Sequence, residues 1–201
     1  YWKSIDEIHG KNKKIKNATK LWMTDNNGEI GRGKNDLKIR KNTKTEEDRL
    51  GIIEAVKANK IDIFATDHAP HTFEEKKKTY PDCPSGLPLV QHSLLLLLEF
   101  FHQGQLTLET IVAKTSHNVA EIYGIKDRGF IREDYWADLV LVNLDSKTHV
   151  SPESILYECS WSPFVDKTFN SMINKTFVNG ELVYNAGNII TETSGIRLDF
   201  E

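Results

Sequence analysis

The sequence predicts an α/β fold in which helices dominate before about residue 125 and strands dominate after it. Two local patterns carry this prediction. A capped helix that starts at Thr45 leads directly into the apolar segment 61–66, and a helix followed at once by an apolar strand is the unit that builds parallel sheets. Near the C-terminus, Asn179-Gly180 separates two runs of alternating apolar residues, which is a strong signal for a two-residue β-hairpin.

Composition and charge limit the classes of protein that this chain can represent. Its 201 residues are 39% hydrophobic and 27% charged, which is typical of a folded soluble domain. The longest apolar run, 94–98, is far shorter than the roughly 18 residues of a membrane span, and the net charge of −3 gives no case for nucleic acid. Cys83 and Cys159 are isolated, so we expect a reduced, cytoplasmic setting and no disulfide framework.

The first 60 residues are predicted to contain three elements and a short extended piece. Residues 4–14 show a polar helical pattern, 15–22 are expected to form a strand, and 36–40 are expected to be extended. Thr45 then begins a helix, because threonine is a good N-cap and the acids after it lie where the helix dipole favours negative charge. This helix is expected to end near residues 59–60.

The central elements are predicted from apolar periodicity and from helix-ending residues. Segment 61–66 is expected to be a buried strand, followed by a loop over 67–87 whose length and prolines are typical of functional loops. A strongly apolar helix is expected to start at Pro88, with Gly104 as its stop. Further elements are predicted in chain order: helices over 108–114 and 118–123, a strand within 129–142, and the hairpin at Asn179-Gly180.

The stretch ATDHAPHTFEEK, residues 65–76, places Asp67, His68 and His71 at the end of the predicted strand. Polar residues at the carboxyl ends of strands carry the chemistry in β/α barrels, and an Asp there can bind a metal and accept a proton from metal-bound water. On spacing alone, a capped turn and a metal site are equally supported, because a catalytic zinc needs at least three protein ligands. The other histidines are scattered and include no HxH pair.

This stretch resembles the signature of the dihydroorotases, a group within the cyclic amidohydrolase superfamily. The likeness covers roughly residues 45–201 and runs through later segments in the family's order. These segments are SGLPLVQHSL (85–94), SHNVAEIYGI (116–125), RGFIREDYWADLVLVN (128–143), CSWSPFVDKTF (159–169) and TFVNGELVYNAG (176–187).

The resemblance implies the C-terminal part of a (β/α)8 TIM-type metal-dependent hydrolase barrel over residues 1–125. It implies strands of a small composite β-sandwich over residues 126–201. The implied activity is zinc-dependent, reversible hydrolysis of the cyclic amide of dihydroorotate to N-carbamoyl-aspartate in de novo pyrimidine biosynthesis. The implied cofactor is a pair of Zn²⁺ ions, and the implied partner is this small-molecule substrate.

The resemblance also assigns roles to individual residues. Asp67 would be the last metal ligand and the catalytic proton shuttle, while His68 belongs to the motif without being a ligand. His71 would bind the substrate carboxylate, and Ser85-Gly86 would offer backbone groups to the pyrimidine ring. Arg40-Lys41-Asn42 stands where the family has an Asn that touches substrate. Arg40 could meet a carboxylate instead, or Asn42 could stand in with a shifted loop.

The remaining metal ligands of the family lie on strands that precede the region of likeness. The HxH pair, the bridging carboxylate and two further histidines have no counterpart in this sequence. A complete barrel takes about 250 residues for its eight strands. The chain is therefore expected to be a C-terminal portion that lacks most metal ligands by itself.

Two alternatives remain open. The first is another cyclic amidohydrolase, such as an allantoinase or a dihydropyrimidinase. The second is a non-catalytic dihydroorotase-like subunit. The changes at Thr19-Lys20, where a His-His pair is usual, and at Arg40 favour it, whereas the intact Asp67 and His71 oppose it. For assembly, the resemblance implies a homodimer or an association with aspartate transcarbamoylase.

Overall fold

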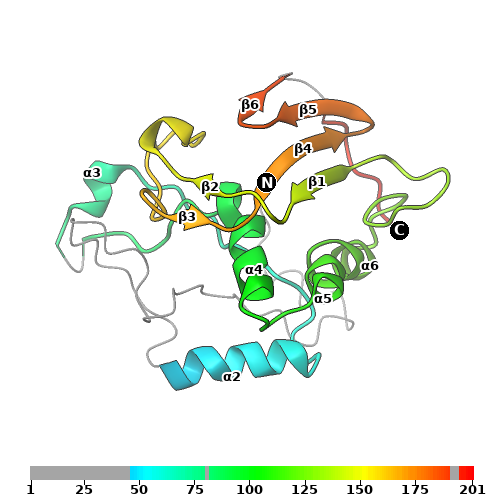
Figure 1. Cartoon of the computed structure of the whole chain (residues 1–201), viewed down its shortest axis with the longest axis horizontal. Helices are drawn as coiled ribbons and strands as arrows, with labels where there is room; N and C mark the ends of the chain where they lie inside the picture. The colour runs from blue at the N-terminus through cyan, green and yellow to red at the C-terminus, as the bar shows by residue number, and fades with distance from the viewer. Residues whose placement is uncertain (1–45, 80–81, 191–194) are drawn as a thin grey trace.

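The computed structural model describes residues 46–79, 82–190 and 195–201 (Figure 1). The elements predicted within residues 4–40 lie outside the described residues, and so does Arg40. The division of the chain at residue 125 stays a prediction.

The helices follow the predicted order, with differences at their ends. Gly124 stops α6 in the left-handed conformation, at φ 64°, as expected for a glycine directly after the predicted helix 118–123. No helix in the described ranges combines the length and apolarity that crossing a membrane requires. The helical elements are α2 (Glu46–Lys57), α3 (Phe73–Lys76), the 3-10 turn η1 (Val90–His92), α4 (Ser93–His102), α5 (Leu108–Val112), the π-helical turn η2 (Ala113–His117) and α6 (Asn118–Tyr123).

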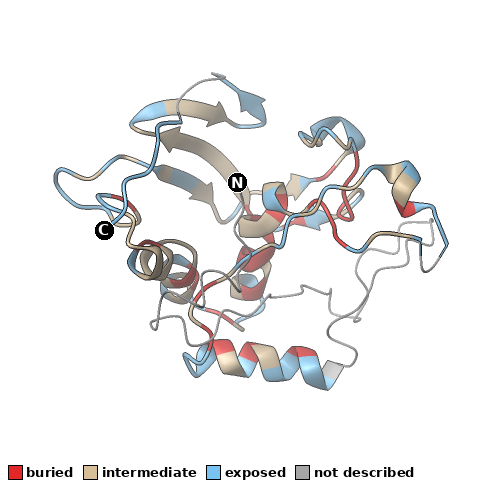
Figure 2. Ribbon diagram, turned by 180° about the vertical axis from the view of Figure 1, so that it is seen from behind, coloured by how far each residue is buried: buried red, intermediate tan, exposed pale blue. Residues whose placement is uncertain are grey.

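Helix α4 is the centre of the core. It is apolar on nearly every side, so it is stable only where other elements cover more than one of its faces. Figure 1 shows α4 running from the strands towards α2, and Figure 2 shows buried residues along both helices. The cluster between α4, α2 and α5 contains Ile53, Val56, Ile61, Leu97, Leu98, Phe100, Leu106 and Ile111.

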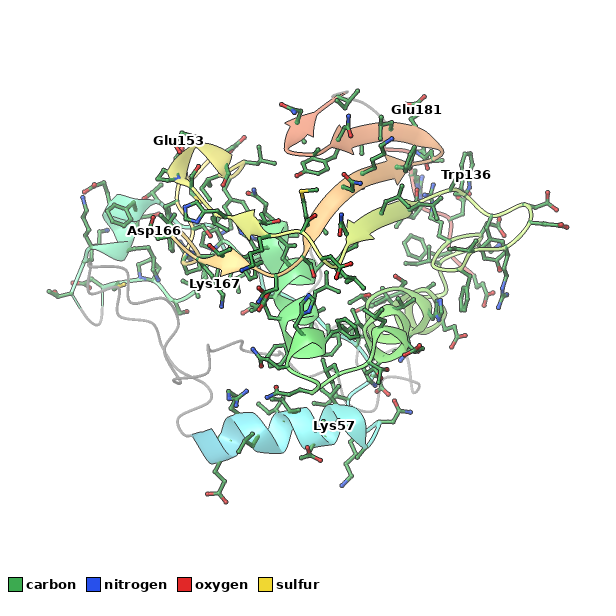
Figure 3. All side chains as sticks on the ribbon, viewed as in Figure 1. Lys57, Trp136, Glu153, Asp166, Lys167 and Glu181 are labelled. Carbon is green, nitrogen blue, oxygen red and sulfur yellow. The ribbon has the colours of Figure 1, made fainter. Side chains whose placement is uncertain are left out.

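The opposite face of α4 packs against a short two-stranded unit, β2 (Thr148–His149) and β3 (Thr168–Phe169). Leu95 and Leu96 of α4 lie in this second cluster with Val150, Phe164 and Phe169. Figure 3 labels Asp166 and Lys167 at the entry to β3, where the Asp166 N–H donates to the Val150 carbonyl at 2.9 Å. The segment between β2 and β3 thus packs on α4, as α2 does on its other face.

The remaining strands form an antiparallel sheet in the order β1-β4-β5-β6. The predicted hairpin is confirmed, since Asn179 and Gly180 join β4 to β5 with φ values of 54° and 86°, as a two-residue turn of this type requires. Trp136, labelled in Figure 3, precedes β1, and the Arg128 guanidinium lies 5.2 Å from its ring centroid. The bounds are β1 (Leu139–Asn143), β4 (Met172–Val178), β5 (Glu181–Asn185) and β6 (Asn188–Ile189).

The prediction of a strand at 61–66 is wrong for the described structure. Ile61 and Ile63 are buried, as a buried strand requires, but no strand of the described residues pairs with this segment. Its partners are instead on η2, where the Lys114 carbonyl accepts the Phe64 N–H at 3.0 Å. A strand exists only when a second strand completes its ladder, so an apolar pattern cannot create one alone.

Three smaller expectations also need correction. The spacing of Leu50, Ile53 and Val56 predicts one apolar face on the helix that follows Thr45, but Leu50 is 47% exposed whereas Ile53 and Val56 are buried. The helix expected from Pro88 begins two residues later, as the 3-10 turn η1. The loop at 67–87 contains the short helix α3, because Thr72 and Glu75 form a reciprocal capping box.

Candidate active site

Asp67 lies where the segment 61–66 leaves the core, and its side chain is exposed. Its backbone adopts the left-handed conformation at φ 50°, which Asp tolerates better than most residues with a side chain. This conformation turns the chain sharply between the buried Ile63 and the loop beyond.

Two side chains, one from η2 and one from α6, hold the segment that leads to Asp67. The Asn118 amide donates to the Asp62 carbonyl at 2.7 Å. The buried Lys114 ammonium donates to Asn59 Oδ1 at 2.8 Å and also to the Ile61 carbonyl. Burial lowers the pKa of Lys114, and the Asp62 carboxylate acts in the opposite direction.

His68 faces the start of the α4 region. Its Nδ1 accepts the Leu89 N–H at 3.0 Å and the Val90 N–H at 3.3 Å. The backbone of His68 also forms a parallel bridge with Leu87, and its ring lies 5.2 Å from the Tyr157 ring. This histidine therefore joins the Asp67 turn to a segment twenty residues later.

His71 is half-buried and is held through its backbone. The buried Trp161 donates its indole N–H to the His71 carbonyl at 2.8 Å. The His71 Nδ1 lies 3.9 Å from Glu75 Oε2. Hydrogen bonds from Thr72, the backbone N–H first and the hydroxyl second, lower the pKa of Glu75.

Ser85 and Gly86 lie against the segment that contains His71. A Cβ added at Gly86 would be 2.6 Å from the Ala69 Cβ and 3.5 Å from the His71 Cδ2, and Gly86 has φ 111°. Only glycine fits this close approach without strain. Ser85 is exposed beside it. The structure thus places His71, which is four residues after Asp67, next to the predicted Ser85-Gly86 pair.

Several residues that support this arrangement carry no clear signal in the sequence. Lys76 is only 2% exposed, and its ammonium donates to the Pro84 carbonyl at 2.6 Å, which anchors the loop just before Ser85. The Tyr157 hydroxyl accepts the Gln91 N–H at 2.8 Å, and burial raises the pKa of Tyr157 to about 12. The partners are separated by up to 66 residues, so only tertiary structure could identify them.

The described residues do not by themselves fit a metal pair. Within the described ranges, no group of three His, Cys, Asp or Glu side chains lies close enough to hold an ion. Asp67 offers a single carboxylate, whereas a catalytic zinc takes at least three protein ligands. Any metal that Asp67 binds must therefore take its other ligands from residues outside the described part.

The arrangement of a helical region followed by an antiparallel sheet is shared with solved hydantoinase structures. An L-hydantoinase from Arthrobacter aurescens superposes with a TM-score of 0.66 at 24% identity, covering 74% of this chain and 34% of that one. A D-hydantoinase from Bacillus sp. AR9 gives 0.68 at 20% identity, covering 85% and 37%.

The chain belongs to the amidohydrolase family, whose sequence model matches residues 9–183. A dihydroorotase from Clostridium acetobutylicum is 35% identical over 150 residues, which cover 74% of this chain and 35% of that protein. A dihydroorotase from Clostridioides difficile is 39% identical over 140 residues, covering 69% and 32%. The resemblance to dihydroorotases is therefore confirmed, and the chain spans about a third of the length of these curated relatives.

Proposed function

We propose that the full-length protein carrying this chain is a dihydroorotase, which interconverts dihydroorotate and N-carbamoyl-aspartate in pyrimidine biosynthesis. The identity to dihydroorotases at 35–39% supports this substrate over the hydantoins. The single structural observation that supports it most is the contact between Gly86 and the Ala69–His71 backbone turn. This contact places the two predicted substrate-binding segments side by side, directly after Asp67.

The proposed reaction needs a proton carrier, and Asp67 is exposed at a sharp turn where it can serve. Water adds to the ring amide carbonyl, the ring C–N bond breaks, and the leaving nitrogen must gain a proton that the water loses. We assign this transfer to the Asp67 carboxylate. The zinc pair expected from the resemblance would use Asp67 as one ligand, with the others supplied from outside the described residues.

The proposed substrate contacts follow from the charge and shape of dihydroorotate. Its carboxylate suits the imidazole of His71, which is half-buried. The backbone of the exposed residue Ser85, beside the buried Gly86, can donate and accept hydrogen bonds along the ring amides. Arg40 stays a predicted contact to the carboxylate. A cytoplasmic location, a homodimer and an association with aspartate transcarbamoylase also stay predictions.

The test compares the full-length protein with its Asp67→Ala and His71→Ala variants on dihydroorotate. We expect Asp67→Ala to lower kcat by about 10²–10⁴-fold, the usual contribution of a general acid–base group. His71→Ala should mainly raise KM, because it removes a contact to a part of the substrate that does not react. Unchanged turnover by the Asp67→Ala protein would rule out the assigned role.

The same assay decides between dihydroorotase and hydantoinase or dihydropyrimidinase, the activity of the solved structures that share the fold. Hydantoin, dihydrouracil and allantoin serve as competing substrates. A wild-type protein that hydrolyses one of these and leaves dihydroorotate unchanged would overturn the proposal. A well-folded protein that hydrolyses neither dihydroorotate nor any of these three compounds would favour the non-catalytic subunit.

A further inference from the structure

We infer that His68 is a positioning residue that acts through its Nδ1 atom. It fastens the Asp67 turn to the start of the α4 region and so fixes the two substrate-binding segments relative to each other. The effect on turnover rests on the proposed function. The hydrogen bonding of the ring does not, and it can be tested separately.

The first step concerns the free N–H groups at the start of a helix. The helical run formed by η1 and α4 begins after Leu89, whose side chain cannot cap it. Helix starts leave backbone N–H groups without partners inside the helix. His68 Nδ1 takes up two of them, from Leu89 and Val90 at 3.0 and 3.3 Å. His68 therefore does for this helix what an N-cap side chain does elsewhere, although it lies 21 residues upstream.

The second step concerns the ring itself. A nitrogen that accepts hydrogen bonds carries no proton, so a neutral His68 must hold its proton on Nε2. The two backbone donors therefore select one of the two neutral tautomers. The ring is also 5.2 Å from that of Tyr157, whose hydroxyl accepts the Gln91 N–H. The same helix start thus holds both aromatic rings.

The third step concerns the register between the two segments. The Ala69 N–H donates to the Leu87 carbonyl at 3.0 Å, and His68 pairs with Leu87 in a parallel bridge. These contacts leave Gly86 directly against Ala69. The His68 side chain crosses from one segment to the other just beyond this pairing. Without its Nδ1 acceptor, the segments would keep the backbone pairing of His68 and Ala69 with Leu87 and lose the two bonds from Leu89 and Val90.

The test exploits the two ring nitrogens, using variants of the full-length protein. In His68→Asn, the amide oxygen occupies a place close to that of Nδ1, whereas in His68→Gln it lies closer to that of Nε2. We expect His68→Asn to keep kcat/KM within about threefold, and His68→Gln and His68→Ala to lose about 10–100-fold, the scale of a misplaced catalytic group. His149→Gln serves as the control, since His149 is exposed on β2 and should be replaceable.

Two activity results would overturn the inference. If His68→Gln retained activity and His68→Asn lost it, Nε2 would be the working atom. If all three variants kept wild-type activity, the hydrogen bonds to His68 Nδ1 would have no role in positioning. The melting temperature of each variant separates loss of folding from loss of register.

A second measurement stands even where dihydroorotate is not the substrate. Histidine ring nitrogens labelled with ¹⁵N in the wild-type full-length protein report which nitrogen carries the proton, with His68→Asn assigning the signal. Because Nδ1 accepts two backbone N–H groups, we expect the neutral His68 ring to carry its proton on Nε2. A proton on Nδ1 would contradict the inference directly. Failure of the proposed function alone would leave this signal unchanged and remove only the activity comparison.

Discussion

At the scale of the residue, the described structure places one histidine in an apolar interior. His92 is 3% exposed, and its ring packs against those of Tyr157, Phe164 and Phe169. Its Nδ1 makes no hydrogen bond within the described residues. Burial lowers the pKa of His92 to about 4, because the charged ring would lose its hydration there.

The buried His92 predicts a loss of stability in mild acid. An unfolded chain protonates this histidine below about pH 6.5, whereas the folded chain resists until about pH 4. The unfolded state therefore binds more protons between these values. The contribution of the neutral His92 to the free energy of unfolding is fully present above pH 6.5 and is lost as the pH falls towards 4. The loss reaches about 3 kcal/mol when the pKa difference is fully titrated. Urea unfolding at a series of pH values measures it.

The matched variants for this prediction are His92→Phe and His149→Gln. The first removes the titrating group from the interior, so its free energy of unfolding should change less between pH 6.5 and pH 4. The second removes an exposed histidine and should keep the wild-type slope. An identical slope in His92→Phe would show that other groups cause the acid sensitivity.

Gly86 is the second residue whose environment dictates its identity. Gly86→Ala introduces a methyl group 2.6 Å from the Ala69 Cβ on a backbone at φ 111°. We expect a loss of about 1–3 kcal/mol in the free energy of unfolding, the range for strained backbone and overpacking. Displacement of the neighbouring His71 should also raise the KM for substrate.

Gly51→Ala is the control for this change. Gly51 lies in the exposed part of α2, and an added Cβ there meets no atom within 4 Å. This variant should gain up to about 1 kcal/mol, because alanine is a better helix former than glycine. Equal effects of the two alanines would contradict the close approach at Gly86.

At the scale of the element, segment 61–66 depends on η2 and α6 for its partners. Lys114→Met keeps the packing of the side chain but removes the ammonium that bonds Asn59 and the Ile61 carbonyl. We expect a loss of about 1–3 kcal/mol, because a buried carbonyl is left without its donor. Amide hydrogen exchange should rise in the peptide that covers residues 59–67.

Lys57→Met provides the comparison for Lys114→Met. Lys57, labelled in Figure 3, lies on the outside of α2 and pairs with Glu54 at 2.8 Å in an exposed position. Such surface pairs contribute about 0–1 kcal/mol, so stability and exchange should change little. Unaltered exchange at 59–67 in Lys114→Met would show that the packing of Ile61 and Ile63 suffices to hold the segment.

At the scale of the whole molecule, the chain spans about a third of the length of its dihydroorotase relatives. It offers Asp67 as a predicted metal ligand, but no cluster of three donor side chains forms within the described ranges. Large apolar side chains are also exposed on β1 and near the C-terminus, including Val140, Leu141, Ile189 and Phe200. The metal content of the purified chain tests whether the site is complete.

We predict that the 201-residue chain, purified alone, holds much less than one zinc ion per chain. Asp67 alone cannot complete the ligand set of a catalytic zinc, and the HxH pair expected from the resemblance has no counterpart in the sequence. Elemental analysis after dialysis measures the metal content, and Asp67→Ala tests its origin. Stoichiometric zinc in the wild-type chain that disappears in Asp67→Ala would contradict the prediction.

The sequence determined what depends on neighbouring residues. Asn179-Gly180 favoured the β4–β5 hairpin, because few other dipeptides accept two positive φ values. Gly124 ended α6, because glycine accepts the positive φ of a helix end. The motif from Asp67 to His71 and the later matching segments identified the family. In each case the information lies within a few residues or in an order of motifs along the chain.

Only the tertiary structure decided which distant residues support the candidate site. It replaced the predicted strand at 61–66 with a segment held by Lys114 and Asn118, and it revealed the bonds from Trp161 to His71 and from Leu89 to His68. The physical reason is the same in all of them. Hydrogen bonds form between whichever donors and acceptors folding brings together, and here the partners are separated by 21 to 90 residues.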